Sequence, residues 1–255
     1  MKKALSFLLS PFFYLGFGLI LVVFHILQVI AYNLFGYPAH KKVVDMLNYA
    51  TLKNLLILGA RVSFHGNPEL PRDRPLIVIS NHQSMFDIPP LGWRFRKHHP
   101  KYVSKIELGR NIPSISYNLR HGGSALIDRK NVKQALMEVI RFGKYIAANN
   151  YAACIFPEGT RGRDGILKKF KISGIDALLK TAPNALIVPF VIDGNYRLFE
   201  NGFFPLPVGL KIRYTVLDPI EPQQMPLQEL ILKVENLIRK ELEPAGVLEP
   251  AHGNT

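Results

Sequence analysis

A histidine and an aspartate whose side chains could act together, His82 and Asp87, stand directly after an apolar run of the sequence. The run occupies residues 76–79 behind Pro75, and its β-branched residues predict a buried strand. Open α/β sheets place their chemistry at the carboxyl ends of their strands, which is where this pair falls. If the carboxylate accepts a hydrogen bond from one imidazole nitrogen, the other nitrogen can accept a proton near neutral pH. The residue types therefore predict a general base.

The spacing of the pair constrains the backbone between its two members. On a helix, five residues turn the chain roughly 140° past a full circle, so His82 and Asp87 would not share a helix face. The pair can form only if the chain bends after the strand. A histidine and an aspartate at this spacing are a weak signal alone, and the position at a strand end strengthens it.

A second polar turn, Phe-Pro-Glu-Gly-Thr-Arg at residues 156–161, follows another apolar run at residues 152–155. If both runs are strands of one sheet, their carboxyl ends meet at the same edge. Glu158 and Arg161 would then lie at the edge that carries the His/Asp pair.

The chain resembles the glycerolipid acyltransferase family, specifically the bacterial 1-acyl-glycerol-3-phosphate acyltransferases. The resemblance covers roughly residues 60–220 and rests on four sequence blocks in the family's order, which are far more specific than one block. These blocks are Asn-His-x4-Asp at 81–87, Gly-Ser-Ala-Leu-Ile-Asp-Arg at 123–129, Phe-Pro-Glu-Gly-Thr-Arg at 156–161 and Val-Pro-Phe-Val-Ile-Asp-Gly at 188–194. The family often has Ser after the arginine of the third block, where this chain has Gly162.

The resemblance implies transfer of a fatty acyl group from an acyl thioester to the free hydroxyl of 1-acyl-glycerol-3-phosphate, which gives phosphatidic acid. The thioester would be carried by acyl carrier protein or by coenzyme A, and the sequence leaves this choice open. His82 would take the hydroxyl proton while Asp87 orients the imidazole, without an acyl-enzyme intermediate. The sequence shows no motif for a metal or a cofactor. The substrate-binding residues that the resemblance implies are Glu158, Gly159, Thr160, Arg161, Arg129 and Lys105.

Within this set the expected roles differ. Glu158 and Thr160 would shape the turn, whereas Arg161 and the Gly159 backbone N–H would hold the phosphate of the acceptor lysophospholipid.

Two further basic residues follow short predicted strands. Lys105 follows a strand at residues 101–104, and in the family a lysine in this context is associated with the head group of the acceptor. Arg129 follows a strand at residues 124–127, where a guanidinium can clamp a phosphate. For both residues, a solvated surface side chain remains the alternative.

The composition indicates one core and an anionic partner. The chain has 255 residues, 48% of them apolar, which is enough for one substantial core. Its formal net charge is +13. Nucleic acid is disfavoured because no recognition motif is evident, so an anionic membrane surface fits the charge better.

The N-terminal region predicts a membrane anchor. Residues 4–40 contain no charged side chain, and about 20 apolar residues span a bilayer. A secretory signal is disfavoured because its apolar core would be only about 7 to 15 residues long. Pro11 is expected to break or kink the helix and leave residues 12–35 continuous. Residues 43–59 predict a second apolar helix, which Gly59 would end.

The sequence is compatible with more than one topology of this anchor. Lysines flank the apolar region on both sides, so a single span, a re-entrant pair and an interfacial pair of helices are all compatible with it. The resemblance implies a two-helix membrane motif, with the catalytic domain on the cytoplasmic face of the bacterial inner membrane.

The expected fold is α/β, a mixed central β-sheet wrapped by helices and preceded by an N-terminal helical membrane motif. The expected organisation is an anchor at residues 1–59, a catalytic domain at 60–243 and a flexible tail at 244–255. Cys154 is the only cysteine, so no intramolecular disulfide can form. It lies in an apolar run, which favours a small buried side chain over a nucleophile.

Three rival functions remain for this sequence. The closest is acyl transfer to another acceptor, such as glycerol-3-phosphate or a lyso-aminolipid. An esterase or thioesterase could use the same pair on water, although the chain has no Gly-x-Ser-x-Gly motif. A non-catalytic lipid-binding protein is disfavoured because it would not need the His/Asp pair.

Overall fold

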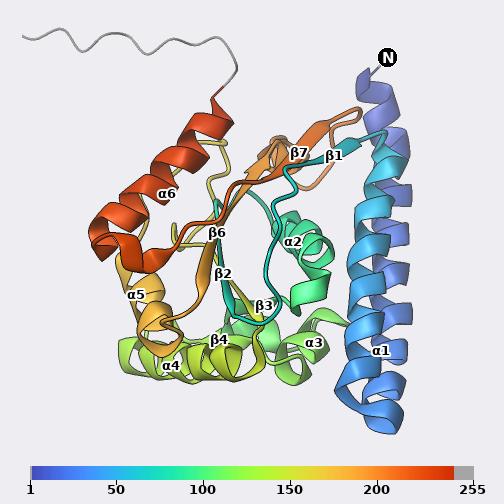
Figure 1. Cartoon of the computed structure of the whole chain (residues 1–255). Coiled ribbons are helices and arrows are strands. Elements are labelled where there is room, and N and C mark those ends of the chain that lie inside the picture. Colours follow the sequence, from blue (N-terminus) through green and yellow to red (C-terminus); the bar gives the residue numbers. More distant parts are fainter. Residues whose placement is uncertain (1, 244–255) are drawn as a thin grey trace, which may run out of the picture.

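The computed structural model describes residues 2–243, so the expected flexible tail at residues 244–255 lies outside the described part of the chain. A seven-stranded sheet forms the centre, in the order β1-β7-β6-β2-β5-β3-β4 (Figure 1). Its strands are β1 (Arg61–His65), β2 (Leu76–Ser80), β3 (Lys101–Lys105), β4 (Ala125–Ile127), β5 (Ala152–Ile155), β6 (Leu186–Asp193) and β7 (Lys211–Val216). The predicted apolar runs are confirmed as strands.

The sheet is mixed, as predicted, and its pairing sets one functional edge. Strands β6, β2, β5, β3 and β4 run parallel to one another. Strand β7 runs antiparallel to β6, and β1 pairs parallel with β7 at the edge of the sheet. The carboxyl ends of the five parallel strands therefore point in the same direction, and the loops that follow them lie at one edge of the sheet.

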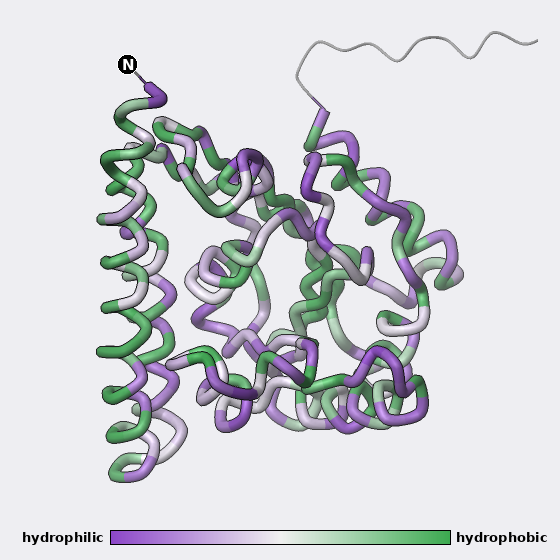
Figure 2. The backbone as a smooth tube through the Cα atoms, turned by 180° about the vertical axis from the view of Figure 1, so that it is seen from behind, coloured by the Kyte–Doolittle hydropathy of each residue, from purple (hydrophilic) through white to green (hydrophobic). Residues whose placement is uncertain are grey.

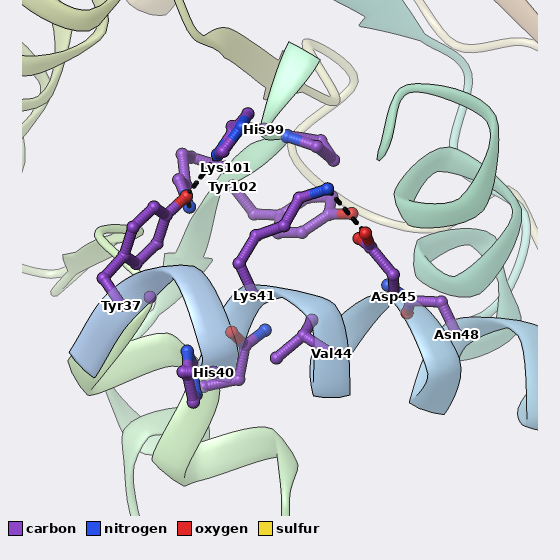
Figure 3. A pocket seen from close by; sticks show the side chains of 12 residues that line it. Tyr37, His40, Lys41, Val44, Asp45, Asn48, His99, Lys101 and Tyr102 are labelled. Atoms are coloured by element: carbon purple, nitrogen blue, oxygen red, sulfur yellow. Dashed lines mark hydrogen bonds and ion pairs between the residues drawn. The ribbon is translucent and has the colours of Figure 1, made fainter. Parts of the chain in front are cut away.

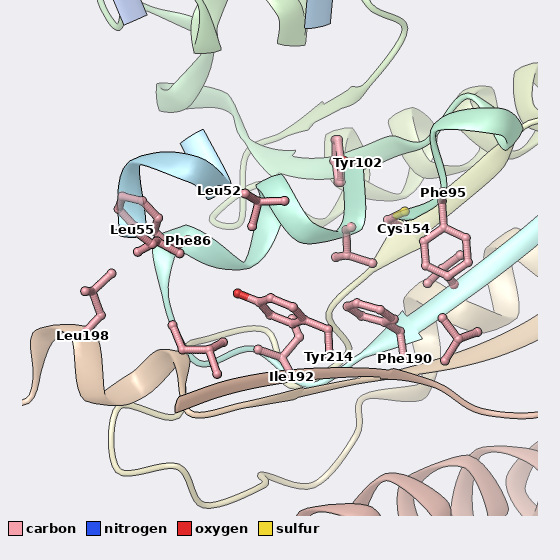
Figure 4. Close-up of a cluster of buried hydrophobic side chains, with 14 of the residues drawn as sticks. Leu52, Leu55, Phe86, Phe95, Tyr102, Cys154, Phe190, Ile192, Leu198 and Tyr214 are labelled. Atoms are coloured by element: carbon pink, nitrogen blue, oxygen red, sulfur yellow. The ribbon is translucent and has the colours of Figure 1, made fainter. Parts of the chain in front are cut away.

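Alternation along the central strands divides the core between the two faces of the sheet. In β2, Leu76 and Val78 belong to one apolar cluster, whereas Ile77 and Ile79 belong to the other. The first cluster lies beneath α1 (Lys2–Asn54) and α2 (Ile88–Arg94), and Figure 4 shows part of it around Tyr214 and Phe190. The second lies beneath α4 (Val132–Asn149), α5 (Ile172–Thr181) and α6 (Leu227–Leu242). The short helix α3 (Ile115–His121) precedes β4.

The long helix α1 is an antiparallel hairpin of two helical arms (Figure 1). Gly36 separates the arms with φ 72° and ψ −166°, a conformation that favours glycine. The expected break at Pro11 is wrong, because the first arm stays helical through it. Tertiary packing around the proline outweighs the one lost backbone hydrogen bond: Phe13 is fully buried, and the Ser10 hydroxyl accepts from Leu206 N–H at 2.8 Å.

The second arm ends as predicted. It continues into a 3-10 turn, Leu55–Leu58, and Gly59 closes the turn in the left-handed conformation. The two arms are joined by polar contacts on their facing sides. Asn54 Nδ2 donates to the carbonyl oxygen of Phe13 at 3.0 Å, and the side chains of His40 and Gln28 lie 3.2 Å apart.

The inner side of the hairpin is part of the main core. Phe13, Leu55 and Leu58 are buried in the same cluster as Phe86 and Leu91, which follow β2. The expected boundary between anchor and catalytic domain falls at the end of the hairpin, yet the hairpin shares its packing with the sheet.

The outer side of the first arm is apolar along its length, and green residues dominate that arm in Figure 2. By length and composition, the stretch Lys2–Leu58 could cross a membrane. An exposed surface of aliphatic and aromatic side chains this large indicates contact with lipid. These side chains include Leu8, Phe12, Leu15, Leu19, Val22, Ile26, Ile30, Leu34 and Phe35.

Two glycines of the first arm allow the packing of the hairpin to be tested. A methyl group at Gly16 would collide with Asn54 Oδ1, whereas a methyl group at Gly18 would meet open space. Both Gly→Ala substitutions raise helix propensity by about 1 kcal/mol. We expect Gly18→Ala to preserve or raise the melting temperature in detergent, and Gly16→Ala to lower the free energy of unfolding by about 1 to 3 kcal/mol. Equal stability of the two variants would contradict the observed packing of the arms.

Candidate active site

The chain bends after β2 in the way that the His/Asp spacing requires. Residues Met85–Asp87 form a 3-10 turn that Ser84 caps, with its hydroxyl accepting from Phe86 N–H at 3.1 Å. The same turn brings Asp87 back to the strand end, where its Oδ2 accepts from the N–H groups of Gln83 and Ser84 at 2.6 and 2.9 Å. His82 Nδ1 lies 2.7 Å from that oxygen. The predicted pair is therefore formed in the structure.

The surroundings of the pair determine which imidazole nitrogen is available. The Asp87 side chain is fully buried, and a carboxylate acts only as an acceptor, so His82 Nδ1 carries the hydrogen. The ring of His82 stacks on Phe156, with centroids 4.2 Å apart and an interplanar angle of 18°. His82 Nε2 has no hydrogen-bond partner within residues 2–243. It is thus positioned to accept a proton from a bound molecule.

The turn after β5 holds the histidine in place through its backbone. Glu158 is buried, and its Oε1 accepts from His82 N–H at 2.6 Å while its Oε2 accepts from Lys168 N–H at 3.0 Å. Gly162 N–H donates to the carbonyl oxygen of His82 at 2.7 Å. Burial raises the pKa of Glu158, and the two backbone N–H groups oppose this shift. Both motifs therefore form one hydrogen-bonded unit.

The expectation for the Gly159 N–H is revised by the structure. This N–H donates to the carbonyl oxygen of Phe156 at 3.1 Å and so closes the turn, for which Gly159 adopts φ 72°. It is not free for a phosphate. Thr160 is exposed, and its hydroxyl lies 3.5 Å from Lys168 Nζ.

The basic residues implied by the family resemblance follow three neighbouring strands at the same edge. Arg161 follows β5, Arg129 follows β4, and Lys105 ends β3. Arg129 donates to the carbonyl oxygen of Gly159, which fixes it beside the turn. Arg161 is half-buried and its guanidinium has no hydrogen-bond or ion-pair partner in the described residues. Burial lowers the pKa of Arg161, and the charge of Asp87 opposes this shift. Lys105 is exposed.

Sequence reasoning missed two asparagine contacts that join β2 to β6. The side chain of Asn81 donates to the carbonyl oxygen of Ile192 at 2.7 Å and accepts from its N–H at 2.8 Å. Asn195 Nδ2 donates to Asp87 Oδ1 at 2.7 Å. The fourth sequence block ends at Gly194, one residue before Asn195. The block therefore indicated the correct strand end but did not include the residue that bonds Asp87.

Cys154 is buried in β5, as predicted. Burial raises the pKa of its thiol, which disfavours the thiolate that a nucleophile requires.

A separate polar pocket lies at the amino end of β3, between that strand and the hairpin (Figure 3). Figure 3 shows Lys101 pointing toward Tyr37 and Lys41 toward Asp45, and Lys101 Nζ donates to the Tyr37 hydroxyl at 2.7 Å. The pocket has a volume of about 20 Å³, room for little more than one water molecule. None of the predicted site residues lines it, so it is distinct from the His/Asp edge.

Comparison with known proteins identifies the family. A sequence model described as "Acyltransferase" matches residues 61–193, which include β1 to β6 and the His/Asp pair. The chain belongs to the acyltransferase family.

Several curated members of this acyltransferase family are similar in sequence. A 1-acyl-sn-glycerol-3-phosphate acyltransferase from Limnanthes douglasii is 30% identical over 145 residues, which are 56% of this chain and 50% of the relative. The protein of the same name from Borreliella burgdorferi is 24% identical over 197 residues, 74% of this chain and 75% of the relative. The chain spans about half the length of the first of these relatives.

A solved structure shares the architecture of this chain. The crystal structure of the 1-acyl-sn-glycerophosphate (LPA) acyltransferase PlsC from Thermotoga maritima superposes with a TM-score of 0.78 at 25% sequence identity. The match covers 95% of this chain and 96% of that chain. It therefore includes the N-terminal hairpin as well as the sheet.

The polar pocket predicts a pH dependence of stability. Burial, with the charge of Lys41 adding to it, lowers the pKa of Lys101 from 10.5 to about 7. Between about pH 7 and about pH 10.5 the unfolded chain therefore binds more protons than the folded chain, so the free energy of unfolding rises with pH. We expect the melting temperature of the wild type to rise relative to that of Lys101→Met across this window. The exposed Lys97→Met is the control, and it should follow the wild type at every pH.

Proposed function

We propose that this protein is a membrane-associated 1-acyl-sn-glycerol-3-phosphate acyltransferase. It transfers a fatty acyl group from an acyl thioester, carried by acyl carrier protein or coenzyme A, to the free hydroxyl of the lysophospholipid and forms phosphatidic acid. The observation that carries the proposal is the 2.7 Å contact between His82 Nδ1 and the buried Asp87, which leaves Nε2 at the functional edge without a hydrogen-bond partner among the described residues. The similar enzymes named 1-acyl-sn-glycerol-3-phosphate acyltransferase support the choice of substrates.

The proposed reaction is a single displacement assisted by a general base. His82 Nε2 takes the proton of the acceptor hydroxyl as its oxygen attacks the thioester carbonyl. The new C–O ester bond forms, the C–S bond breaks, and the thiolate leaves with the proton that His82 returns. Asp87 holds the imidazole in the required tautomer and stabilises the positive charge that develops on it.

The phosphate of the acceptor requires a cationic partner near this base. Arg161 is half-buried and free of partners within the described residues, so its guanidinium can bind a phosphate through two parallel hydrogen bonds. Arg129 and Lys105 belong to the same edge and add positive charge. Thr160, which is exposed in the same turn, lies at the rim of this proposed phosphate site, whereas Glu158 holds the turn itself.

The membrane face of the enzyme is the outer side of the hairpin in this proposal. The inner side of the hairpin packs on Phe86, the residue before Asp87, which places the membrane contact close to the dyad. A lipid acceptor could then reach the dyad from the bilayer. We assign the catalytic domain to the cytoplasmic face of a bacterial inner membrane, where both thioester donors are made. Protease accessibility in inverted and right-side-out vesicles tests this assignment.

An acceptor panel tests the substrate assignment. The purified protein is incubated with a labelled acyl thioester and, separately, 1-acyl-glycerol-3-phosphate, glycerol-3-phosphate, a lyso-aminolipid or water alone. We expect label in phosphatidic acid. Label in a different acylated product would assign a different acceptor to the enzyme. Release of free fatty acid without transfer would identify a thioesterase.

The general-base role predicts a loss of turnover without a loss of binding. His82→Ala should lower kcat by about 10² to 10⁴ while lysolipid binding changes little, because a base acts in the transition state. Asp87→Asn should also be severely impaired, since it can stabilise the wrong imidazole tautomer. Turnover and melting temperature are measured on the same preparations, with the exposed His65→Ala as the matched control.

A purely structural histidine would give a different result. Its loss would lower the melting temperature and reduce activity only in proportion to the unfolded fraction. A folded, membrane-bound His82→Ala protein that keeps more than about a tenth of wild-type kcat would exclude the general base.

The phosphate-site role predicts a selective effect on the acceptor. Arg161→Ala removes a charge-assisted contact of about 1.5 to 3 kcal/mol and should raise the apparent KM for the phosphate-bearing acceptor by roughly 10- to 150-fold. The KM for the thioester donor should change far less. The exposed Arg72→Ala, before β2, controls for the loss of one positive charge. Equal effects on both substrates would remove Arg161 from the acceptor site.

A further inference from the structure

Asp87 presents two oxygens, and the proposed reaction uses only one of them. Oδ2 faces His82 Nδ1 at 2.7 Å, whereas Oδ1 accepts from Asn195 Nδ2 at 2.7 Å. Asn195 is fully buried and follows β6, 108 residues from Asp87 in the sequence. Its side-chain oxygen accepts from the hydroxyl of Tyr214, on β7, at 2.9 Å. A continuous line of hydrogen bonds thus runs from Tyr214 through Asn195 and Asp87 to His82.

We propose that Asn195 and Tyr214 are positioning residues for acyl transfer, which set the orientation and the basicity of the His82–Asp87 pair. This inference rests on the proposed function of the pair. Asn195 and Tyr214 are both fully buried, so their effect on the reaction passes through Asp87.

The hydrogen bond from Asn195 restricts rotation of the Asp87 carboxylate, which the hydrogen bonds within the loop do not restrict. The Gln83 and Ser84 N–H groups bind Oδ2, the same oxygen that faces His82, and therefore leave Oδ1 unrestrained. The donor from Asn195 fixes Oδ1 and with it the plane of the carboxylate. Because the plane of the carboxylate directs Oδ2 at the imidazole, the direction in which His82 Nε2 points depends on that plane.

The tyrosine decides which way the asparagine amide points. An amide can present either its NH2 group or its oxygen to Asp87, and only the NH2 group is a donor. The Tyr214 hydroxyl donates to the amide oxygen and so turns the NH2 group toward Asp87. Burial raises the pKa of Tyr214 far above its usual 10.0, so the hydroxyl keeps its proton at working pH.

The hydroxyl of Tyr214 is itself held by the packing of its ring. The ring is fully buried between Phe190, stacked at a centroid distance of 6.1 Å and 9°, and Phe64, at 5.1 Å and 38°. Figure 4 shows the tyrosine within this cluster, with its hydroxyl at the end away from Phe190. The line of contacts therefore begins in the core and ends at Nδ1 of the imidazole whose other nitrogen, Nε2, takes the proton.

A pair of Tyr→Phe substitutions tests the proposal with a minimal change. Tyr214→Phe removes one oxygen that donates to Asn195, whereas Tyr102→Phe removes one that has no partner within residues 2–243. Both rings are buried in the same core cluster, so each substitution removes one hydroxyl group from the same core. Full-length variants are assayed with acyl thioester and lysophosphatidate across pH, and their melting temperatures are recorded.

We expect Tyr214→Phe to lower kcat about tenfold with both KM values within about twofold of wild type. The acid limb of its kcat/KM profile should move to higher pH. The reason is that a less firmly held Asn195 compensates the negative charge of Asp87 less well, which favours the protonated imidazole. Tyr102→Phe should match the wild type in rate and in pH profile. A Tyr214→Phe protein whose rate and profile equal those of Tyr102→Phe would overturn the proposal.

Asn195→Asp gives an independent readout. An aspartate at this position can donate to Asp87 only while the two carboxyl groups hold a shared proton, so we expect activity to fall as pH rises and that proton leaves, and to recover in part at lower pH. A uniform loss at all pH values would contradict the role. If this variant does not fold, the Tyr214→Phe comparison still decides. The proposed function fails separately, through an active His82→Ala protein, while the positioning role fails only through Tyr214 and Asn195.

Discussion

The buried carboxylate of Asp87 is the constraint on which the active-site edge depends. An ionised group removed from water requires hydrogen-bond donors in its place, and Asp87 receives four. Two are backbone N–H groups of its own turn, one is His82, and one is Asn195 from the end of β6. The loops after two different strands must therefore converge on a single side chain. This requirement explains why Asn81, one residue before the histidine, is bonded to the backbone of β6 as well.

The same edge depends on a second buried carboxylate with a different task. Among the described residues, the side chain of Glu158 accepts hydrogen bonds from two backbone N–H groups, those of His82 and Lys168. Its contribution is to fix the third sequence block against the first, so that the histidine cannot shift along the sheet edge. One acid thus orients the imidazole ring, while the other holds the backbone that carries the ring.

The sequence was informative wherever local pattern decides structure. Apolar runs located the central strands, and Gly59 marked the end of the hairpin, because burial and left-handed backbone leave local signatures. The expected break at Pro11 is absent, since tertiary packing holds the proline in the helix, whereas the expected end of the first helix at residue 35 lies next to Gly36. Asn195 carried no local signal, because its partner lies 108 residues away. The hydrogen bond of the Gly159 N–H could not be predicted either, since a sequence does not show which backbone groups are hydrogen-bonded within a turn.

The position of β1 has a consequence for biosynthesis. This strand follows the apolar hairpin directly, yet within the described residues its neighbour in the sheet is β7 (Lys211–Val216), which is translated after every other strand of that sheet. A nascent polypeptide that has not reached β7 holds β1 unpaired, while the lipid-facing first arm has already left the ribosome. Insertion of the hairpin into a bilayer and completion of the sheet are therefore separate events in time, and the first can tether the chain while the second is still in progress.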